Sequence, residues 1–167
     1  MARIKVINEI SELVAIFHSC DTKVKRDVFE EVTKDWVTLE QIKEKYGKKG
    51  EEALKYLEKI KLVETQWLTT PKGPVKAYHT YYTHIQINMT IPILESGDII
   101  YASTMSEKPL KEYERKIIEM IEGNPAGIFI GDIVKELGIS QTLAKGIIKR
   151  SAKLEMRGHN VVVREDA

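Results

Sequence analysis

The sequence has a single cysteine, Cys20, among its 167 residues. One thiol excludes an internal disulfide framework and a zinc site built from several thiolates. No apolar run approaches the roughly 20 residues that a membrane helix requires. The first residues, Met1 to Lys5, lack the apolar centre of a signal peptide. We therefore expect a soluble, cytoplasmic protein that makes no contact with membranes.

The chain also lacks an excess of charge of either sign. It contains 26 Lys and Arg against 25 Asp and Glu, which gives a formal net charge of +1. This balance excludes a uniformly basic surface, so any contact with nucleic acid must depend on the local placement of charge. Hydrophobic residues make up 43% of the chain and charged residues 31%, as in ordinary globular proteins.

Motifs for catalysis are missing as well. The sequence contains no Gly-rich phosphate-binding loop, no carboxylate pair in a cleft motif and no metalloprotease spacing. His79 and His84 lie an odd number of residues apart in an expected strand, so they point to opposite faces and do not form a metal pair. We predict that the protein is not an enzyme and that it has neither a cofactor nor a metal site.

The first part of the sequence has the hydrophobic periodicity of helices. Apolar residues recur at helical spacing in four segments: 8–20, from residue 22 onward, 38–47 and 50–61. Asp21 or Thr22 can cap the second helix, and Thr38 with Gln41 predicts a capping box for the third. Gly47 is expected to end the third helix in a left-handed conformation.

After these helices the period changes to that of a β-hairpin. Residues 62–68 are predicted to form a strand, and a Pro- and Gly-rich turn at 70–74 follows. A long second strand is expected from Val75, because Ile and polar residues alternate along its later part up to Ile91. The order helix, helix, helix, strand, turn, strand is typical of a winged helix-turn-helix domain.

A similar order follows in the second half. We expect a turn at 96–98, a short strand at 99–101 and a helix that opens at 106–109. The remaining expected elements are helices at 110–121, 130–137 and 141–153 and a hairpin of strands 154–157 and 161–164. The predicted fold class is α+β, with two tandem winged helix-turn-helix domains: residues 1–94 with a long wing strand, a linker at 95–108, and residues 109–167.

The expected helix 141–153 has one cationic side. Its apolar residues cluster on one side of a helical wheel. The opposite side collects polar and basic residues: Gln141, Thr142, Lys145, Lys149 and Lys153, with Arg150 at the flank. Six basic residues stand against one acid, Glu155, between residues 138 and 164. Gly146, between the lysines, would let a nucleic-acid backbone approach closely.

This cationic side matches what a helix in the major groove of DNA requires. A helix-turn-helix reads DNA with its second helix while phosphate contacts fix the register. The predicted contacts are Lys145, Lys149 and Lys153 for phosphates, Gln141 and Thr142 for base edges, and Arg150 and Arg157 as further basic residues. The alternatives are a solvated basic face without a partner, or an acidic partner other than DNA.

The corresponding helix of the first half, at 50–61, is less basic. Its exposed side carries Glu51, Glu52 and Glu58 beside two lysines, and three carboxylates would repel phosphates. Contacts with the DNA backbone remain expected from lysines before, within and after this helix: Lys48, Lys49, Lys55, Lys72 and Lys76. The alternative is a helix that supports a dimer or another protein surface.

Residues 21–67 resemble ArsR-type winged-helix regulators, especially archaeal ones. Three runs carry the resemblance: DTKVKRDVF from Asp21, VTLEQI from Val37 and ALKYLEKIKLVE from Ala53. The last run is similar to the recognition helix of the family and the wing strand after it. Residues 131–148 resemble a generic helix-turn-helix, and the whole arrangement is similar to that of archaeal regulators of motility genes.

The resemblance implies a dimeric transcription factor bound to promoter DNA. Two features depart from the family pattern: the paired-cysteine motif of its metal-sensing members is missing, and the helix at 50–61 is acidic. We expect a sequence-specific regulator that binds double-stranded DNA as a homodimer and places its C-terminal recognition helix in the major groove.

Two other classes of protein stay open. Tandem winged helices also serve as protein–protein interaction adaptors that do not read DNA, and such an adaptor would not need the cationic side of helix 141–153. A redox- or metal-responsive switch built on Cys20 would lose its response in the variant Cys20→Ser but would keep its DNA affinity in the reduced state.

Overall fold

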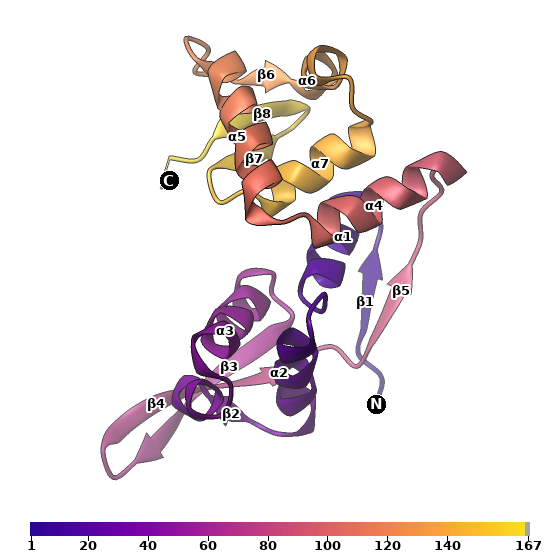
Figure 1. The fold of residues 1–167 in the computed structure, drawn as a ribbon. Helices are drawn as coiled ribbons and strands as arrows, with labels where there is room; N and C mark the ends of the chain where they lie inside the picture. Colours follow the sequence, from indigo (N-terminus) through magenta and orange to yellow (C-terminus); the bar gives the residue numbers. More distant parts are fainter. Residues whose placement is uncertain (166–167) are drawn as a thin grey trace. The chain divides into compact units, whose positions relative to one another are not determined.

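The computed structural model describes residues 1–165, which form helices and small antiparallel and parallel sheets in an α+β fold (Figure 1). The contacts divide the chain into two compact units. Unit 1 comprises residues 1–6 and 19–87, and unit 2 comprises residues 7–18 and the chain from Asn88 onward.

These bounds differ from the domains expected at 1–94 and 109–167. The first helix belongs to unit 2, and the expected linker 95–108 contributes a helix to the same unit. Residues 166 and 167, the end of the expected second domain, lie outside the described residues.

Unit 1 contains three helical segments, a three-stranded sheet and a separate pair of strands. Its elements are β1 (Ile4–Ile7, whose last residue is counted with unit 2), α2 (Lys23–Lys34), β2 (Val37–Thr38), α3 (Leu39–Lys59), β3 (Val63–Thr70), β4 (Gly73–Thr80) and β5 (His84–Ile87). Both predicted helix starts are confirmed. Thr22 accepts a hydrogen bond from the backbone of Lys25, and Thr38 forms a capping box with Gln41.

Helix α3 consists of two segments joined at Gly47. This glycine has φ 69° and ψ −157°, so the sign of φ is as expected for a helix end, but ψ is not that of a left-handed helix. The second segment therefore begins directly at Lys48, with no intervening loop. Its buried residues, Ala53, Leu54 and Leu57, face the core of unit 1.

The sheet of unit 1 has the order β2-β4-β3, and all its strands are antiparallel. Val37 pairs with Tyr78, and the hairpin β3–β4 runs from the pair Val63–Thr80 to the pair Thr70–Gly73 at its tip. The predicted hairpin and its turn are confirmed.

The long strand expected from Val75 to Ile91 is wrong, because it is interrupted after Thr80. Residues 84–87 form the separate strand β5, which pairs with β1. The carbonyl of Arg3 accepts from the amide of His84, and that of Ile7 accepts from the amide of Asn88. From the first of these hydrogen bonds to the second, the residue number rises in both strands, so β1 and β5 run parallel.

The later part of unit 2 repeats the order helix, strand, helix, helix, strand, strand that unit 1 has from α2 to β4. The elements of unit 2 are α1 (Ile10–His18), the 3-10 helix η1 (Ile93–Glu95), α4 (Ser96–Thr104), α5 (Glu107–Ile121), β6 (Ile128–Phe129), α6 (Ile130–Leu137), α7 (Gln141–Arg150), β7 (Leu154–Arg157) and β8 (Asn160–Val163). Its sheet has the order β6-β8-β7, with the last strand in the middle, as in unit 1. The predicted helices and hairpin of this half are confirmed, although α7 ends three residues earlier than expected.

Helix α4 replaces the turn and strand that we expected at 96–101. Ile99, Ala102 and Ser103 are buried at helical spacing, so one side of the segment packs inward. The hydroxyl of Ser103 donates to the carbonyl of Ile99, one helical turn earlier. The Ser-Gly-Asp signal at 96–98 thus marks the first turn of a helix and not a hairpin.

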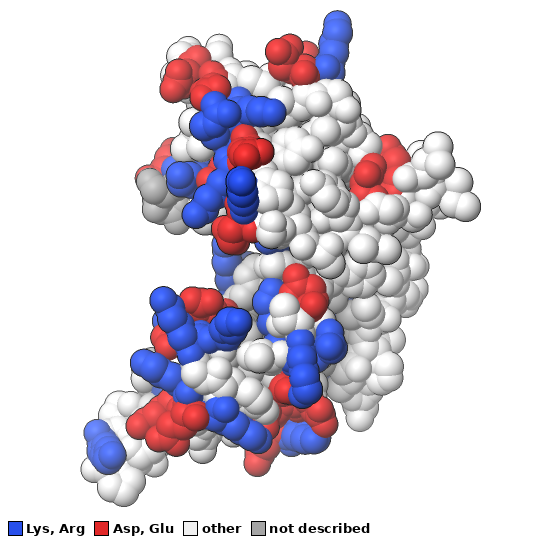
Figure 2. Space-filling model, viewed as in Figure 1, with Lys and Arg blue, Asp and Glu red and all other residues white. Residues whose placement is uncertain are grey.

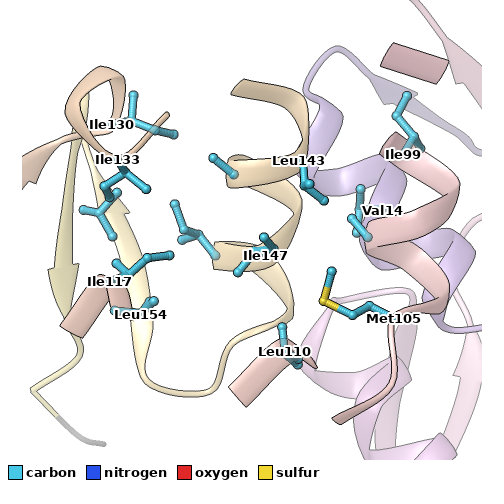
Figure 3. Packing of buried hydrophobic residues seen from close by; sticks show 14 of the residues in the cluster. Val14, Ile99, Met105, Leu110, Ile117, Ile130, Ile133, Leu143, Ile147 and Leu154 are labelled. Carbon is cyan, nitrogen blue, oxygen red and sulfur yellow. The ribbon is translucent and has the colours of Figure 1, made fainter. Parts of the chain in front are cut away.

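The core of unit 2 surrounds α7 (Figure 3). Leu143 and Ile147 of α7 belong to one cluster with Val14 of α1 and Ile99 of α4. Residues of α5, α6 and the hairpin β7–β8 complete the cluster on the other side of α7. Six of the ten residues of α7 are buried, so most of its surface lies inside the unit.

Candidate nucleic-acid interface

The middle of α7 packs against two other helices of unit 2. A Cβ atom added to Gly146 would lie 2.6 Å from the Cβ of Ala102 and 3.3 Å from Val14 Cγ2. Gly146 therefore allows close approach, but of helices α4 and α1. The expectation that this glycine lets a nucleic-acid backbone approach is wrong for this structure.

Two hydroxyls at the start of α7 are bonded to carboxylates of η1 and α4. Ser140, the N-cap of α7, donates to Asp98 at 2.7 Å, and Thr142 donates to Glu95 at 3.0 Å. The side chain of Thr142 is buried, with 2% of the residue exposed. Thr142 was predicted to reach a base edge, but the structure directs its only side-chain donor to Glu95.

Three of the basic residues predicted to contact DNA are engaged inside unit 2. Lys145 forms an ion pair with Glu9 at 3.2 Å, and Lys153 lies 3.7 Å from Glu114. Arg150 donates to the backbone carbonyls of Ala102 and Met105 at the end of α4. These contacts join α7 and the turn after it to Glu9, just before α1, to the end of α4 and to α5.

The other residues of this predicted set lie closer to solvent. The carboxylates of Glu165 and Glu155 both bond to Arg157 and raise the pKa of its guanidinium. Gln141 and Lys149 are exposed, and within residues 1–165 Lys149 forms no ion pair. Among the described residues of α7, Lys149 is therefore the exposed lysine of the cationic side that has no acidic partner.

Unit 1 presents a different surface at the second segment of α3. Lys48 and Lys49 are its first two residues after Gly47, and both are exposed. Among the described residues neither lysine has an acidic partner. Figure 2 shows basic and acidic side chains interspersed over this unit.

Two of the three carboxylates of this helix are paired with lysines of unit 1. Glu51 lies 2.7 Å from Lys55 and 3.7 Å from Lys43, which comes from the first segment of α3. The hydrogen bond from Lys55 holds the pKa of Glu51 below its usual range, and the same contact raises the pKa of Lys55. The contact of Lys43 was not predictable from the sequence, because it crosses the break at Gly47.

The third pair joins the helix to the hairpin. Lys76 of β4 donates to Glu58 of α3, and this hydrogen bond raises the pKa of Lys76. Lys76 is the direct partner of Trp67 in the register of β3 and β4. Cross-strand partners project from the same face of a sheet, so Trp67 lies on the face that Lys76 directs toward α3.

The hairpin beyond this point is exposed. Trp67 is 70% exposed, Leu68 is 37% exposed, and Lys72 lies exposed at the tip without an ion pair among residues 1–165. Sequence analysis missed Trp67, although an aromatic residue in a strand next to a Pro- and Gly-rich turn is a signal for a surface contact. Lys48, Lys49, Lys72 and Trp67 are therefore the candidate contact groups of unit 1.

Groups considered for metal or redox chemistry have partners within the chain. The His79 ring stacks on Trp36 with ring centroids 5.3 Å apart, and His84 bonds to Thr83. Cys20 is half-buried, with its Sγ 3.5 Å from the hydroxyl of Ser19. Within the described part of the chain no three His, Cys, Asp or Glu side chains are grouped as a metal site requires.

No helix between residues 1 and 165 has both the length and the hydrophobicity needed to cross a membrane. A search of curated proteins found no match to the chain. A family model described as ArsR transcriptional regulator matches residues 7–165, which includes elements of both units. The family is one of transcription regulators and not of enzymes. The chain therefore belongs to the ArsR transcriptional regulator family.

Proposed function

We propose that this protein regulates transcription by binding double-stranded DNA through unit 1, and that each unit is a winged helix-turn-helix. The shared element order and the shared sheet order of the two units support the second part. In unit 1 the two segments of α3 then form the helix pair, the second segment enters the major groove and the hairpin β3–β4 is the wing.

The observation that carries this proposal is the pair of lysines at the start of the second segment of α3. The amino end of a helix carries a positive partial charge, which disfavours further positive charges beside it. Lys48 and Lys49 lie at such an end, and among the described residues no acid compensates their charges. A DNA phosphate at this position would accept hydrogen bonds from both lysines and from free helix amides. Lys72, at the wing tip, can reach a second stretch of backbone.

The acidic residues of this helix do not prevent the contact. Glu51 and Glu58 are held by lysines of unit 1, so their charges are locally balanced. Glu52 is exposed and can accept a hydrogen bond from cytosine N4 in the major groove, which would contribute to specificity. The repulsion expected from three carboxylates is thereby reduced to that of one.

The contacts predicted between unit 2 and DNA remain a prediction. Under the present proposal they would belong to a second interface. The burial of Thr142 and the ion pairs of Lys145 and Lys153 argue against α7 as the main reading helix. The exposed Lys149 gives a test, because Lys149→Glu would weaken binding if α7 lies in a groove. If unit 1 is the main interface, we expect the DNA affinity of the Lys149→Glu variant to stay within about twofold of that of the wild type.

The decisive experiment uses the full chain and a duplex recovered by pull-down of genomic DNA with the purified protein. We expect the double variant Lys48→Glu, Lys49→Glu to lose at least tenfold in affinity and about 0.9 in salt slope for each phosphate contact removed. The matched control, Lys111→Glu with Lys116→Glu, makes the same charge change on the exposed side of α5 and should bind nearly as the wild type. Equal losses in both double variants, or no salt-dependent binding to any recovered duplex, would contradict the proposal.

A protein–protein adaptor is the second candidate function, and the enclosure of α7 favours it. Lys145 and Arg150 of α7 make contacts within unit 2, and these contacts explain both residues without a nucleic acid. An adaptor predicts that the salt titration shows no specific duplex binding for the wild type.

A further inference from the structure

The outer side of η1 and α4 carries exposed apolar residues in an unbroken row. Ile93 and Leu94 are 85% and 90% exposed, and Ile100 and Tyr101 are 61% and 46% exposed. Together with positions 97 and 104 they recur at intervals of three or four, so they lie on one side of the helical segment. We name this side the outer stripe; its members are Ile93, Leu94, Gly97, Ile100, Tyr101 and Thr104.

The outer stripe has no charged group, although 31% of the chain is charged. Residues 88–106 contain only two charged side chains, Glu95 and Asp98. Both carboxylates accept hydrogen bonds from hydroxyls at the start of α7, and α7 packs against the buried side of α4. In Figure 2 the surface at the place of α4 is almost entirely white, with one acidic patch.

The polar groups along the stripe are bonded within the segment. The hydroxyl of Thr104 donates to the carbonyl of Ile100 at 2.8 Å, and that of Ser96 donates to the carbonyl of Ile93 at 2.6 Å. A partner can therefore cover this side without leaving those two hydroxyls unsatisfied. Interfaces between proteins are depleted of charge at their centre in the same way.

From these observations we infer that the outer stripe is the surface through which two copies of this chain associate. The inference rests on the proposed function, because it gives a location to the homodimer that the family resemblance implies for such a regulator. A neutral apolar row is complementary to itself, so a two-fold axis can place the stripe of one copy against that of the other. A nucleic acid or another highly charged partner would find no opposite charge there.

The exposed area is sufficient for a specific dimer. A large side chain presents roughly 150–200 Å² when fully exposed, so the four apolar residues expose on the order of 500 Å² in each copy. Two copies together reach the roughly 1,000 Å² that a specific interface must bury. Gly97, at the middle of the stripe, has no side chain, and this allows two helices to approach closely.

Gly97 also gives a clean test of the inference. A Cβ at this position would meet no atom within 4 Å, and its φ is not in the left-handed region, so a larger residue fits the isolated chain. The variants Gly97→Arg and Ile100→Glu place a charge in the stripe. The matched control is Phe129→Glu, because Phe129 is 51% exposed in the same unit but lies outside the stripe.

The measurement is sedimentation equilibrium of the full chain from about 1 to 100 µM, with circular dichroism to show that each variant is folded. We expect the wild type and Phe129→Glu to dimerise, and both stripe variants to weaken the dimer at least a hundredfold. A monomeric wild type at every concentration, or a dimer that keeps its strength in both stripe variants, would overturn the inference. Loss of the dimer to the same extent in Phe129→Glu would also overturn it.

Binding of the same proteins to a short duplex with a single half-site separates this inference from the DNA-binding proposal. Stripe variants that become monomeric and still bind the half-site support both. A wild-type dimer that depends on the stripe but binds no duplex supports the inference and contradicts DNA binding. If the wild type binds the half-site and its dimer keeps its strength in both stripe variants, the result supports DNA binding and contradicts the inference.

Discussion

Gly146 shows how one residue determines what a helix can contact. Its missing side chain brings α7 against Ala102 and Val14, and a larger residue would have to separate these helices. The same glycine in an open position on a helix would be unfavourable by about 1 kcal/mol relative to Ala. Close packing is therefore the physical reason for glycine at this point of unit 2.

We predict that Gly146→Ala destabilises the protein by about 1–3 kcal/mol, because the added methyl overfills the contact with Ala102. Urea unfolding followed by circular dichroism measures the effect. Gly97→Ala is the matched control, since open space surrounds that position and the gain in helix propensity should leave stability unchanged or slightly higher. A Gly146→Ala protein as stable as the wild type would show that α4 and α7 are not closely packed.

At the same scale, local residue contacts were predictable from the sequence and distant ones were not. The capping box of Thr38 and Gln41 joins residues three apart, and it is confirmed. The partners of Lys145 and Thr142 are Glu9 and Glu95, which lie 136 and 47 residues away. A helical wheel identifies the polar side of α7 but contains no information about which distant helix covers it.

Among the elements, α2 and the first segment of α3 are joined by Glu31. Its carboxylate accepts hydrogen bonds from Lys45 and from Tyr46, the latter at 2.9 Å. The bond from Lys45, with a smaller contribution from Tyr46, lowers the pKa of Glu31. A lowered pKa in the folded state means that the carboxylate stabilises the fold above its usual pKa and that this contribution is lost as the pH falls through the folded pKa.

We therefore expect Glu31→Gln to reduce the stability of unit 1 by about 1 kcal/mol at pH 7. The difference from the wild type should shrink as the pH falls from about 5 to 3, because the wild-type carboxylate becomes protonated. Urea midpoints from tryptophan fluorescence at several pH values measure this, since both tryptophans lie in unit 1. Glu30→Gln is the control, because its pair with Lys34 is largely exposed. Parallel pH profiles for the wild type and Glu31→Gln would exclude the assigned role of Glu31.

Elements with one strongly preferred period were predicted well, and those with mixed signals were not. The hairpin β3–β4 follows from alternation and a Pro- and Gly-rich turn. Residues 96–104 combine β-branched residues with Ser, Gly and Asp, and their helical state depends on burying Ile99 and Ala102 in the core of unit 2. The break before β5 depends on pairing with β1, about 80 residues away in the sequence. Tertiary contacts decide such segments, and a single sequence does not display those contacts.

At the scale of the whole molecule, the two units share the order helix, strand, helix, helix, strand, strand but expose different chemistry. The candidate contact groups of unit 1 are lysines and a tryptophan, whereas the outer stripe of unit 2 is apolar and neutral. The two surfaces support a division in which unit 1 contacts DNA and unit 2 contacts a second copy of the chain. If unit 1 is the main DNA interface, the basic residues near the C-terminus do not mark it. Their number is visible in the sequence, but the contacts that Lys145, Arg150 and Lys153 make within unit 2 are not.

The division predicts how affinity depends on the number of half-sites. A dimer bound to one half-site holds its second DNA-binding unit at a high local concentration, so a duplex with two half-sites should bind at least tenfold more tightly than a duplex with one. Ile100→Glu should abolish this advantage and leave single-site affinity unchanged, because Ile100 lies in unit 2. The variant Lys48→Glu, Lys49→Glu should weaken binding to both duplexes and keep their ratio. Fluorescence anisotropy on the two duplexes measures both effects, and an Ile100→Glu protein that retains the two-site advantage would show that the two copies associate through another surface.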